Sequence, residues 1–427
     1  MGISNIIFAL VFIGACVLFT INIRKIISNI RLGKEVDRSD RKSDRWKTMI
    51  RVALGQSKMT TRPFAAILHL FVYAGFILIN IEMLEIVIDG IAGTHRVFAP
   101  FLGNFYYFII NFFEVLAVLV AVSCIIFLIR RNFKKVARFQ SPELKGWAFK
   151  DANIILFTEV LLMSALLIMN AADPAYEFVV SKNLKGILPS DLHALHVIEQ
   201  SAWWFHIVGV LAFLNYLPYS KHLHIIWAFP NTFFSNLNAK GRLTNMESVT
   251  REVKLMLDPN ANPYAPPADA DAAPQRFGVK DVTDLTWINI MNAYTCTECG
   301  RCTSSCPANI TGKKLSPRKV MMDVRDRVEE LAVAKRKNGK DFHDGKFLLG
   351  DYITDEEVWA CTSCNACVQE CPVNIDPLSI IIDLRRYLVM EESKLPAELA
   401  GMATNIENNQ APWQFSPADR FNWANEA

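Results

Sequence analysis

The sequence lacks a strong net charge, a nucleotide-binding fingerprint and a hydrolase nucleophile motif. Its 427 residues carry a formal net charge of only +3, which does not indicate a nucleic-acid-binding role. No glycine-rich dinucleotide fingerprint lies near a strand, and no nucleophile elbow occurs. The chain therefore shows no site for two-electron organic chemistry, and we expect a partner subunit to hold that site.

Cysteine is scarce outside two short runs. Eight of the ten cysteines lie in CTECGRCTSSCP, residues 296–307, and CTSCNACVQECP, residues 361–372. Cys16 and Cys124 lie in apolar segments, and we interpret them as buried membrane thiols. This distribution excludes a disulfide scaffold and favours a reducing compartment.

Both runs read Cys-x-x-Cys-x-x-Cys-x-x-x-Cys-Pro, the pattern that ligates cubane iron–sulfur clusters. In two-cluster ferredoxins the fourth cysteine of one run ligates the other cluster. A zinc site is the alternative, but zinc sites use pairs of cysteines rather than doubled runs that end in Cys-Pro. We assign one cluster to Cys296, Cys299, Cys302 and Cys371, and the other to Cys361, Cys364, Cys367 and Cys306.

Long apolar segments dominate the first half of the chain. Hydrophobic residues make up 52% of the sequence, and the mean hydropathy is +0.19. Five segments are long and apolar enough to span a bilayer. They are residues 4–23, 64–88, 105–129, 152–170 and 197–219. No cleavage-type site follows the first segment, so we expect a membrane anchor rather than a removed signal peptide.

The charge of the loops predicts the orientation in the membrane. Residues 24–62 hold twelve Lys and Arg, and residues 130–150 hold seven. The two loops that alternate with these hold few Lys and Arg residues. Residues 89–104 hold only Arg96, and residues 171–196 hold two lysines. By the positive-inside rule the N-terminus lies outside and the cysteine runs lie in the cytoplasm of a multi-pass inner-membrane protein.

Composition also separates the soluble part from the membrane part. Residues 257–275 contain five prolines and predict an extended linker. Ser-Pro and Asp-Pro starts followed by apolar residues at helical spacing predict helices over 316–336 and 376–393. We predict an all-α fold, a five-helix cytochrome b-like membrane bundle followed by an α-helical ferredoxin domain with two [4Fe-4S] clusters. The predicted divisions are 1–232 for the haem b membrane domain, 233–276 for the linker, 277–395 for the ferredoxin domain and 396–427 for a C-terminal tail.

Histidines inside or beside spans are functional hypotheses, because ligating groups in a bilayer are costly. His206 and His224 are eighteen residues apart, which in one continuous helix is five turns, on one face and about 27 Å apart. His69 and His224 lie at matching depth near the cytoplasmic side. They are the predicted ligand pair of an inner haem b, and His222 is the weaker alternative to His224.

The segment FHIVGVLAFLNYLPYSKHLHIIWAFPN, 205–231, resembles the last span of the haem b subunit of respiratory nitrate reductase and the membrane subunit of heterodisulfide reductase. The doubled runs with a long helical insert resemble the iron–sulfur subunits of heterodisulfide reductase and of lactate and glycolate oxidases. Their fusion, with NAYTCTECGRCTSSCPANITGKKLSPRKVMMDVRDR, resembles membrane-anchored iron–sulfur proteins of Bacteroidetes-type bacteria.

The nitrate reductase resemblance implies a second, outer haem on His206. In that family span two carries another histidine ten residues after the first, but this sequence has Ile79 there. His95 is the leading replacement ligand, and His193 and His196 are the other candidates. The resemblance also implies a quinone contact near the outer haem, at the depth of His193, His196, Glu199, Trp203 and Trp204. An interfacial aromatic belt is the simpler interpretation of the two tryptophans.

These features predict an electron-transfer subunit of a quinone-linked oxidoreductase. The expected carriers are menaquinone, haem b and two [4Fe-4S] clusters, and the expected partner is an electron-transfer flavoprotein, a 2-hydroxy acid dehydrogenase or a dithiol-oxidising subunit. The alternative is a membrane redox sensor or a scaffold with structural clusters. Glu82 and Glu85 lie one turn apart on span two, and pairing within the bundle is favoured there over proton conduction.

The C-terminal end, residues 405–427, holds two tryptophans and two phenylalanines in a polar segment without helical periodicity. Aromatic residues on such a segment are typical interface anchors. In related fused proteins a similar stretch leads into a cysteine-rich domain, so we expect that domain to be a separate polypeptide that contacts this tail. The alternative is that the tail wraps over its own ferredoxin domain.

Overall fold

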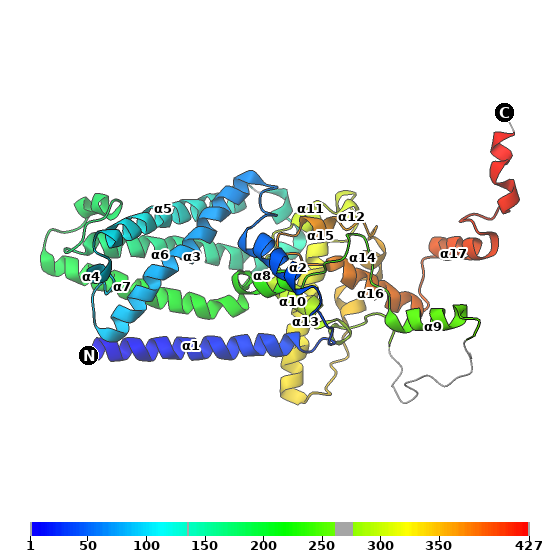
Figure 1. Cartoon of the computed structure of the whole chain (residues 1–427), viewed down its shortest axis with the longest axis horizontal. Coiled ribbons are helices and arrows are strands. Elements are labelled where there is room, and N and C mark those ends of the chain that lie inside the picture. The colour runs from blue at the N-terminus through cyan, green and yellow to red at the C-terminus, as the bar shows by residue number, and fades with distance from the viewer. Residues whose placement is uncertain (1, 135, 261–275, 426–427) are drawn as a thin grey trace.

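A computed structural model describes residues 2–134, 136–260 and 276–425. The fold is 70% helical, and the described residues contain no strand. Long helices fill one half of the elongated molecule and short helices fill the other (Figure 1). The predicted all-α class, with a membrane bundle followed by a ferredoxin domain, is confirmed.

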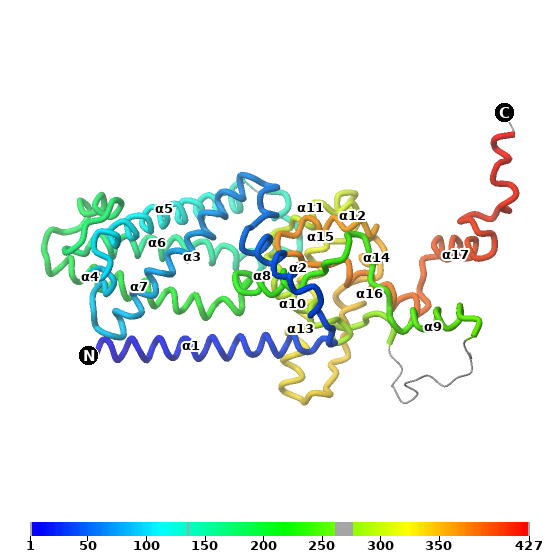
Figure 2. Tube along the Cα trace, in the orientation of Figure 1, coloured from blue at the N-terminus to red at the C-terminus, as the bar shows by residue number. Residues whose placement is uncertain are grey.

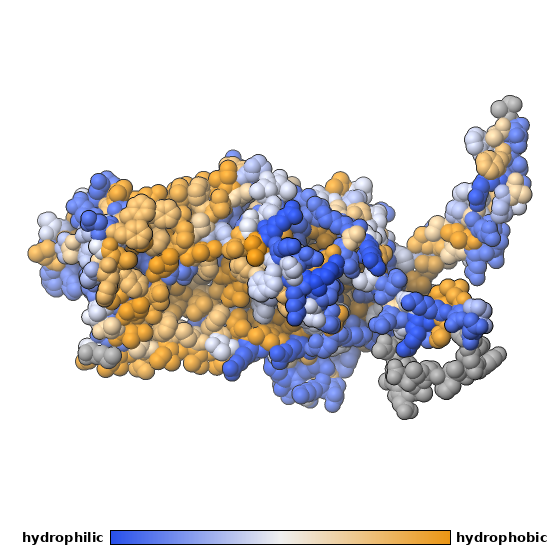
Figure 3. All heavy atoms as spheres, viewed as in Figure 1, coloured by the Kyte–Doolittle hydropathy of each residue, from blue (hydrophilic) through white to orange (hydrophobic). Residues whose placement is uncertain are grey.

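Five long helices are apolar enough to cross a membrane, as the sequence predicts. They are α1 (Ile3–Ile30), α3 (Pro63–Ala92), α5 (Asn104–Asn132), α6 (Trp147–Ala172) and α7 (Leu192–Tyr216). Each helix extends beyond the predicted span at one end or both. On the face shown in Figure 3, hydrophobic residues cover most of this bundle, and hydrophilic residues gather at its far end and around its junction with the other half. These five helices mark the chain as a membrane protein.

The bundle is built from neighbouring helices in chain order. Helix α3 packs on α5, α5 on α6 and α6 on α7, while α1 lies against both α3 and α7. Two glycines permit the close approaches. A Cβ at Gly75 of α3 would collide with Val120 on α5, and one at Gly209 of α7 would come within 2.7 Å of Leu162 on α6. Any larger residue at these positions would push the helices apart.

All of the loops rich in Lys and Arg reach the same end of the bundle. The N-terminus and α4 (Ala99–Leu102) lie at the far end, and the chain returns from α1 through α2 (Lys42–Met49) beside the short helices (Figure 2). The loop between α5 and α6 also meets this second half, since Arg318 donates to the Arg138 carbonyl at 2.8 Å. The arrangement agrees with one side rich in Lys and Arg and one side poor in them, and the side that faces the cytoplasm stays a prediction.

The chain leaves the bundle through a broken helix. Helix α7 ends at Tyr216, two 3-10 turns follow (Leu217–Tyr219 and Lys221–Leu223), and α8 (His224–Phe233) begins anew. Pro218 removes a backbone donor, and Ser220 between the turns is extended, with φ −120° and ψ 150°. The expectation that one continuous helix carries both His206 and His224 is therefore wrong.

Short helices form the ferredoxin half. They are α10 (Trp287–Thr295), α11 (Arg301–Ser304), α12 (Pro307–Ile310), α13 (Pro317–Asn338), α14 (Asp355–Trp359), α15 (Ala366–Glu370) and α16 (Pro377–Met390). The helices predicted over 316–336 and 376–393 are α13 and α16. The Ser316 hydroxyl accepts from the Lys319 amide, and the Asp376 carboxylate accepts from the Ser379 amide. These side-chain caps and a proline at the first helical position explain why both helices begin there.

The hydrophobic core of this half also includes residues from the membrane half. Ile26 and Ile30 of α1 and Leu223 at the junction are buried together with Ile290 and Leu384. Polar contacts cross the same boundary: the Asn29 amide donates to the Tyr294 hydroxyl at 2.8 Å, and the Asn231 amide donates to the Val373 carbonyl at 2.8 Å. The two halves therefore share one core, although the exact domain boundaries stay a prediction.

Two segments lie outside this shared core. Helix α9 (Glu247–Leu257) occupies part of the predicted linker, and residues 261–275 of that linker lie outside the described residues. Helix α17 (Ala397–Asn409) and the tail after it extend away from the ferredoxin half (Figure 1). Trp413 is 46% exposed and Trp423 is 74% exposed. In this structure the described part of the tail, up to residue 425, does not wrap over its own ferredoxin domain.

Candidate iron–sulfur, haem and quinone sites

The two cysteine runs surround two neighbouring cavities. The first cavity is lined by Cys296, Cys299, Cys302 and Cys371. The second is lined by Cys306, Cys361, Cys364 and Cys367, and Cys367 also borders the first. Apart from this shared Cys367, each cavity receives three cysteines from one run and the fourth from the other. The structure brings together the two predicted sets, and their ligation of iron stays a prediction.

Tight backbone turns aim these thiols at the cavities. Glu298, Ser363 and Asn365 have positive φ values of 53°, 56° and 64°, and Gly300 has 72°. Left-handed residues between the cysteines turn the chain sharply enough to present successive side chains to one point. The Ser363 amide donates to Cys361 Sγ at 3.4 Å, and the Ile375 amide donates to Cys371 Sγ at 3.3 Å. Such donors stabilise negative charge on sulfur.

The chemistry of the thiols fits a metal cluster. All eight cysteines of the runs are free of disulfides. Burial raises the pKa of Cys296 to about 12 and that of Cys371 to about 11, so without metal these thiols stay protonated at neutral pH. Metal binding replaces such protons and supplies the charge that the buried thiolate needs. The residues present therefore fit the iron–sulfur clusters predicted from the runs.

Three imidazoles gather where the membrane bundle meets the ferredoxin half. The rings of His222 and His224 lie 5.5 Å apart between centroids, and His69 of α3 is within electrostatic range of both. His224 Nδ1 contacts the Lys221 carbonyl at 3.0 Å, which is the orientation that frees Nε2 for a metal. Burial lowers the pKa of His222 to about 3, so its ring is neutral. The predicted pair of His69 and His224 is brought into one region, and His222 lies beside His224 there.

His206 presents a buried ring nitrogen that could bind a metal. Its side chain is buried within α7, and Nδ1 contacts the Leu162 carbonyl of α6 at 2.9 Å. Nε2 is buried without a hydrogen-bond partner among the described residues. A buried, unpaired ring nitrogen is unfavourable unless a ligand occupies it. His206 could therefore hold a haem through Nε2.

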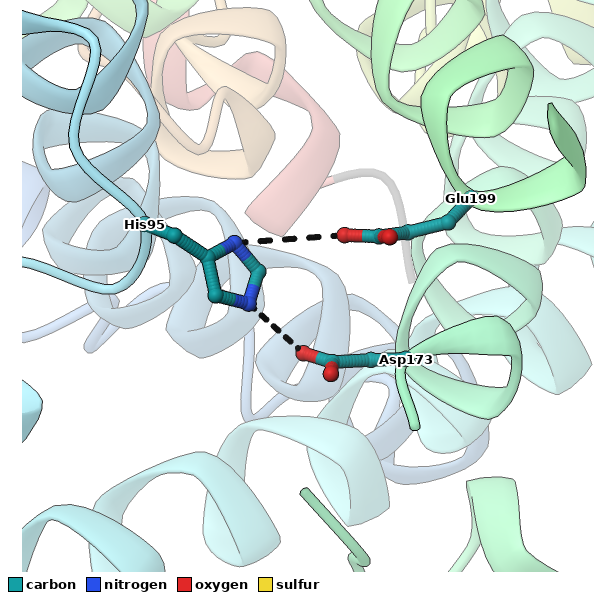
Figure 4. A group of neighbouring side chains, drawn as sticks. All are labelled: His95, Asp173 and Glu199. Atoms are coloured by element: carbon teal, nitrogen blue, oxygen red, sulfur yellow. Dashed lines mark hydrogen bonds and ion pairs between the residues drawn. The ribbon is translucent and has the colours of Figure 1, made fainter. Parts of the chain in front are cut away.

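His95 lies in a different environment from the one predicted. Its side chain is 54% exposed, with Nε2 at 3.1 Å from Asp173 Oδ2 and Nδ1 at 3.9 Å from Glu199 Oε1 (Figure 4). Arg96 Nε also donates to Asp173 Oδ2, at 2.9 Å. Both nitrogens of the ring thus face carboxylates, and no hydrogen bond joins His95 to His206 among the described residues. His193 and His196 are exposed, and His196 approaches Glu199 at 3.6 Å.

A buried polar network that sequence reasoning missed lies behind His95. Arg96 donates to the Tyr106 hydroxyl at 3.1 Å and to the side-chain oxygen Oδ1 of Asn170 at 2.9 Å. The Tyr106 hydroxyl in turn donates to the Glu85 carboxylate at 2.8 Å. Glu85 is thus paired within the bundle, whereas both carboxylate oxygens of Glu82 are buried without a partner among the described residues. The available sequence signal for this network was Arg96, which is the one Lys or Arg residue in the loop 89–104.

An ion-pair bridge connects the first cavity to the histidine junction. Glu298, between Cys296 and Cys299, pairs with Lys221, the residue before His222. Arg325 of α13 pairs with the other Glu298 oxygen at 3.0 Å. All three side chains are largely buried, so this bridge holds the cysteine turn against the exit of α7.

Comparisons with known proteins agree with the cysteine sites. The 4Fe-4S dicluster domain family matches residues 295–375. A probable iron-sulfur-binding oxidoreductase, FadF, of Bacillus subtilis is 28% identical over 99% of this chain and 61% of its own length. The EtfAB:quinone oxidoreductase of Syntrophomonas wolfei is 26% identical over 92% of this chain and 55% of its own length. One component of a CoB-CoM heterodisulfide reductase of Methanosarcina acetivorans is 33% identical over 25% of this chain and 52% of its own length.

The chain therefore spans only 55% to 61% of the first two relatives. No solved structure matches it. The expected resemblance to iron–sulfur oxidoreductases and to heterodisulfide reductase is confirmed, and so is the presence of a 4Fe-4S domain. A Bacteroidetes type and a fused haem domain stay predictions. The similarities support an electron-transfer role for this chain.

Proposed function

We propose that this chain is the membrane-anchored electron-transfer subunit of a quinone-linked oxidoreductase. It would connect menaquinone, haem b and two [4Fe-4S] clusters with a cytoplasmic catalytic partner. One observation carries the proposal: the Lys221–Glu298 ion pair places the first cysteine cavity directly against the histidine junction of the membrane bundle. A soluble ferredoxin has no need for such a junction, whereas an electron carrier between membrane and cytoplasm requires one.

The proposed roles follow from the positions of the side chains. The eight cysteines of the two cavities would hold the clusters, His69 and His224 the inner haem b, and His206 one face of an outer haem b. When bound, these groups supply one-electron transfer. The chain contributes fixed donors to the sulfurs, neutral buried imidazoles and a water-poor junction between them.

Quinone binding is proposed at the far end of the bundle. His95 and Glu199 face each other there at 3.9 Å, beside Trp203 and Trp204, which pack with Phe8. Quinol oxidation releases protons, and a paired imidazole and carboxylate at a bilayer-facing edge can accept them. This assignment gives His95 a role in proton transfer rather than in haem ligation.

Quinol should reduce the haem in membranes that contain this protein, and a quinone-site inhibitor should block that reduction. Glu199→Gln should slow reduction by quinol about 10²-fold, because the variant keeps the shape but loses the base. Stopped-flow absorbance of the haem bands measures this rate, and the dithionite-reduced spectrum is the control for haem content. Haem that reduces with dithionite but not with menaquinol analogues would favour the sensor or scaffold alternative.

His95→Gln separates the two roles considered for that residue. If His95 serves the quinone, the variant keeps its full haem content and loses quinol reduction. If it ligates the outer haem, the variant loses haem in the pyridine haemochrome assay.

The partner is proposed to be a separate cytoplasmic subunit, flavin-containing or cysteine-rich, that binds the tail. The named substrate of the Syntrophomonas relative is EtfAB, and that relative extends well beyond the length matched here. The exposed aromatics of the tail, Trp413, Phe415, Phe421 and Trp423, offer anchors for such a partner. In this proposal the N-terminus lies outside the cell membrane, and the ferredoxin half and tail lie in the cytoplasm.

Replacing Trp413 and Trp423 with alanine should release the partner while iron and haem contents stay unchanged. Each buried interface tryptophan contributes about 2 kcal/mol, so we expect roughly thirtyfold weaker binding per residue. Deletion of 410–427 should have the same effect, measured by co-purification. A truncated protein that keeps its partner at native stoichiometry would contradict the proposal.

A further inference from the structure

The two cysteine cavities differ in the charge that surrounds them. Four cationic side chains lie around the first cavity, and two of them come from loops of the membrane half. Lys58 Nζ donates to the Cys371 carbonyl at 3.1 Å and to the Val368 carbonyl at 3.3 Å. Arg138, in the loop between α5 and α6, is within electrostatic range of Cys299.

The other two cations belong to the ferredoxin half and connect to the first two. Arg301 precedes Cys302, is 3% exposed and donates to the Lys58 carbonyl at 3.0 Å. Arg318 is fully buried, lines the first cavity and donates to the Arg138 carbonyl at 2.8 Å. The four form a connected group, here called the basic collar: Lys58, Arg138, Arg301 and Arg318.

Acidic groups near the first cavity do not cancel the basic collar. Glu298 is already paired with Lys221 and Arg325, and Glu143 pairs with Arg318. Lys58, Arg138 and Arg301 form no ion pair among the described residues, so three cations of the collar stay uncancelled. Glu370 lies within 3.7 Å of Arg62. The balance of charge around the first cavity is therefore positive.

The second cavity has no comparable excess. No charged side chain lines it among the described residues. Arg385 donates to the Val358 carbonyl at 2.9 Å and to the Cys361 carbonyl, and the Asp376 carboxylate lies within electrostatic range of Cys367. With one cation and one acid nearby, the net charge around the second cavity is near zero. Cys364 of this cavity is the exposed one among the eight cysteines, so this side faces outward.

We propose that the basic collar gives a cluster held by Cys296, Cys299, Cys302 and Cys371 a higher reduction potential than a cluster in the second cavity. Reduction adds negative charge, and nearby buried cations stabilise that charge more than distant or paired ones. Electrons that enter at the exposed Cys364 side are then favoured toward the membrane. This inference rests on the proposed function and adds a direction to it, from the cytoplasmic partner toward quinone.

An EPR-monitored redox titration of the intact holo-protein tests the proposal. The wild-type protein should show two one-electron transitions. Lys58→Met should lower only the higher midpoint potential. The expected change is about 59 mV, which corresponds to a tenfold change in the ratio of reduced to oxidised cluster. Arg138→Met should lower the same transition. Arg385→Met should lower only the other transition, because that arginine lies beside Cys361.

Two variants act as matched controls. Lys58→Arg keeps the charge and should keep the wild-type potentials, which separates the effect of charge from the effect of a lost donor. Lys337→Met removes an exposed cation at the far end of α13 and should change neither potential. The proposal is overturned if Lys58→Met and Arg138→Met leave both potentials unchanged, or lower the transition that Arg385→Met lowers. Because the titration uses no quinone, its outcome does not depend on the result of the quinol assay.

Discussion

Replacing Cys371 with alanine should remove the cluster of the first run, although Cys371 belongs to the second run. Of about eight cluster iron atoms per chain, about four should be lost, with the same EPR signal that Cys296→Ala removes. Cys306→Ala and Cys361→Ala should each remove the other EPR signal. The physical reason is the geometry of the two cavities, each of which takes its fourth thiol from the opposite run.

Iron analysis and EPR of the reduced protein measure this result. Cys124→Ala is the matched control, because that thiol is buried in α5 away from both cavities and should leave the iron content unchanged. If Cys371→Ala and Cys361→Ala abolish the same signal while the other persists, the exchange of ligands between runs is refuted.

His69→Ala and His224→Ala should each abolish the same haem b, and His206→Ala should abolish a different one. The first two side chains meet at the junction with the ferredoxin half, whereas His206 is buried at α6 with an unpaired Nε2. Each substitution should lower the pyridine haemochrome value by one haem per chain. The intact protein should then hold about nine or ten iron atoms, about eight of them in clusters.

His222→Ala decides which junction histidine ligates the inner haem. The prediction is that this variant keeps the haem, since Nδ1 of His224 is already held by the Lys221 carbonyl. His343→Ala, on an exposed loop of the ferredoxin half, is the control. Loss of different haems in His69→Ala and His224→Ala would show that the pairing is wrong, and iron-loaded protein without any haem would remove the haem proposal altogether.

Local features of the sequence predicted how the cysteines group in space and where the long helices lie. Spacing within a run is set by short turns, so Cys296, Cys299 and Cys302 could be grouped without knowledge of the rest of the fold. Hydropathy likewise identified all five spans, because a membrane helix needs only a long apolar segment. The caps at Ser316 and Asp376 predicted where α13 and α16 begin.

Contacts between distant residues could not be predicted in the same way. The break after Tyr216 has a visible signal in Pro218, but the eighteen-residue spacing of the histidines by itself predicts one straight helix. The position of His95 depends on the bond of Arg96 to Asp173, which lies 77 residues away in the chain. The basic collar likewise depends on loops of the membrane half folding back onto the cysteine turns, which no periodicity reveals.

The core shared by the two halves has a consequence for the order of biogenesis. Ile26 and Ile30 at the end of α1 leave the ribosome long before Leu384, which belongs to the same buried core. Until the end of the first helix is in place, the ferredoxin half lacks part of its interior. We therefore expect iron to be loaded more readily into chains whose first helix has already been inserted into the membrane.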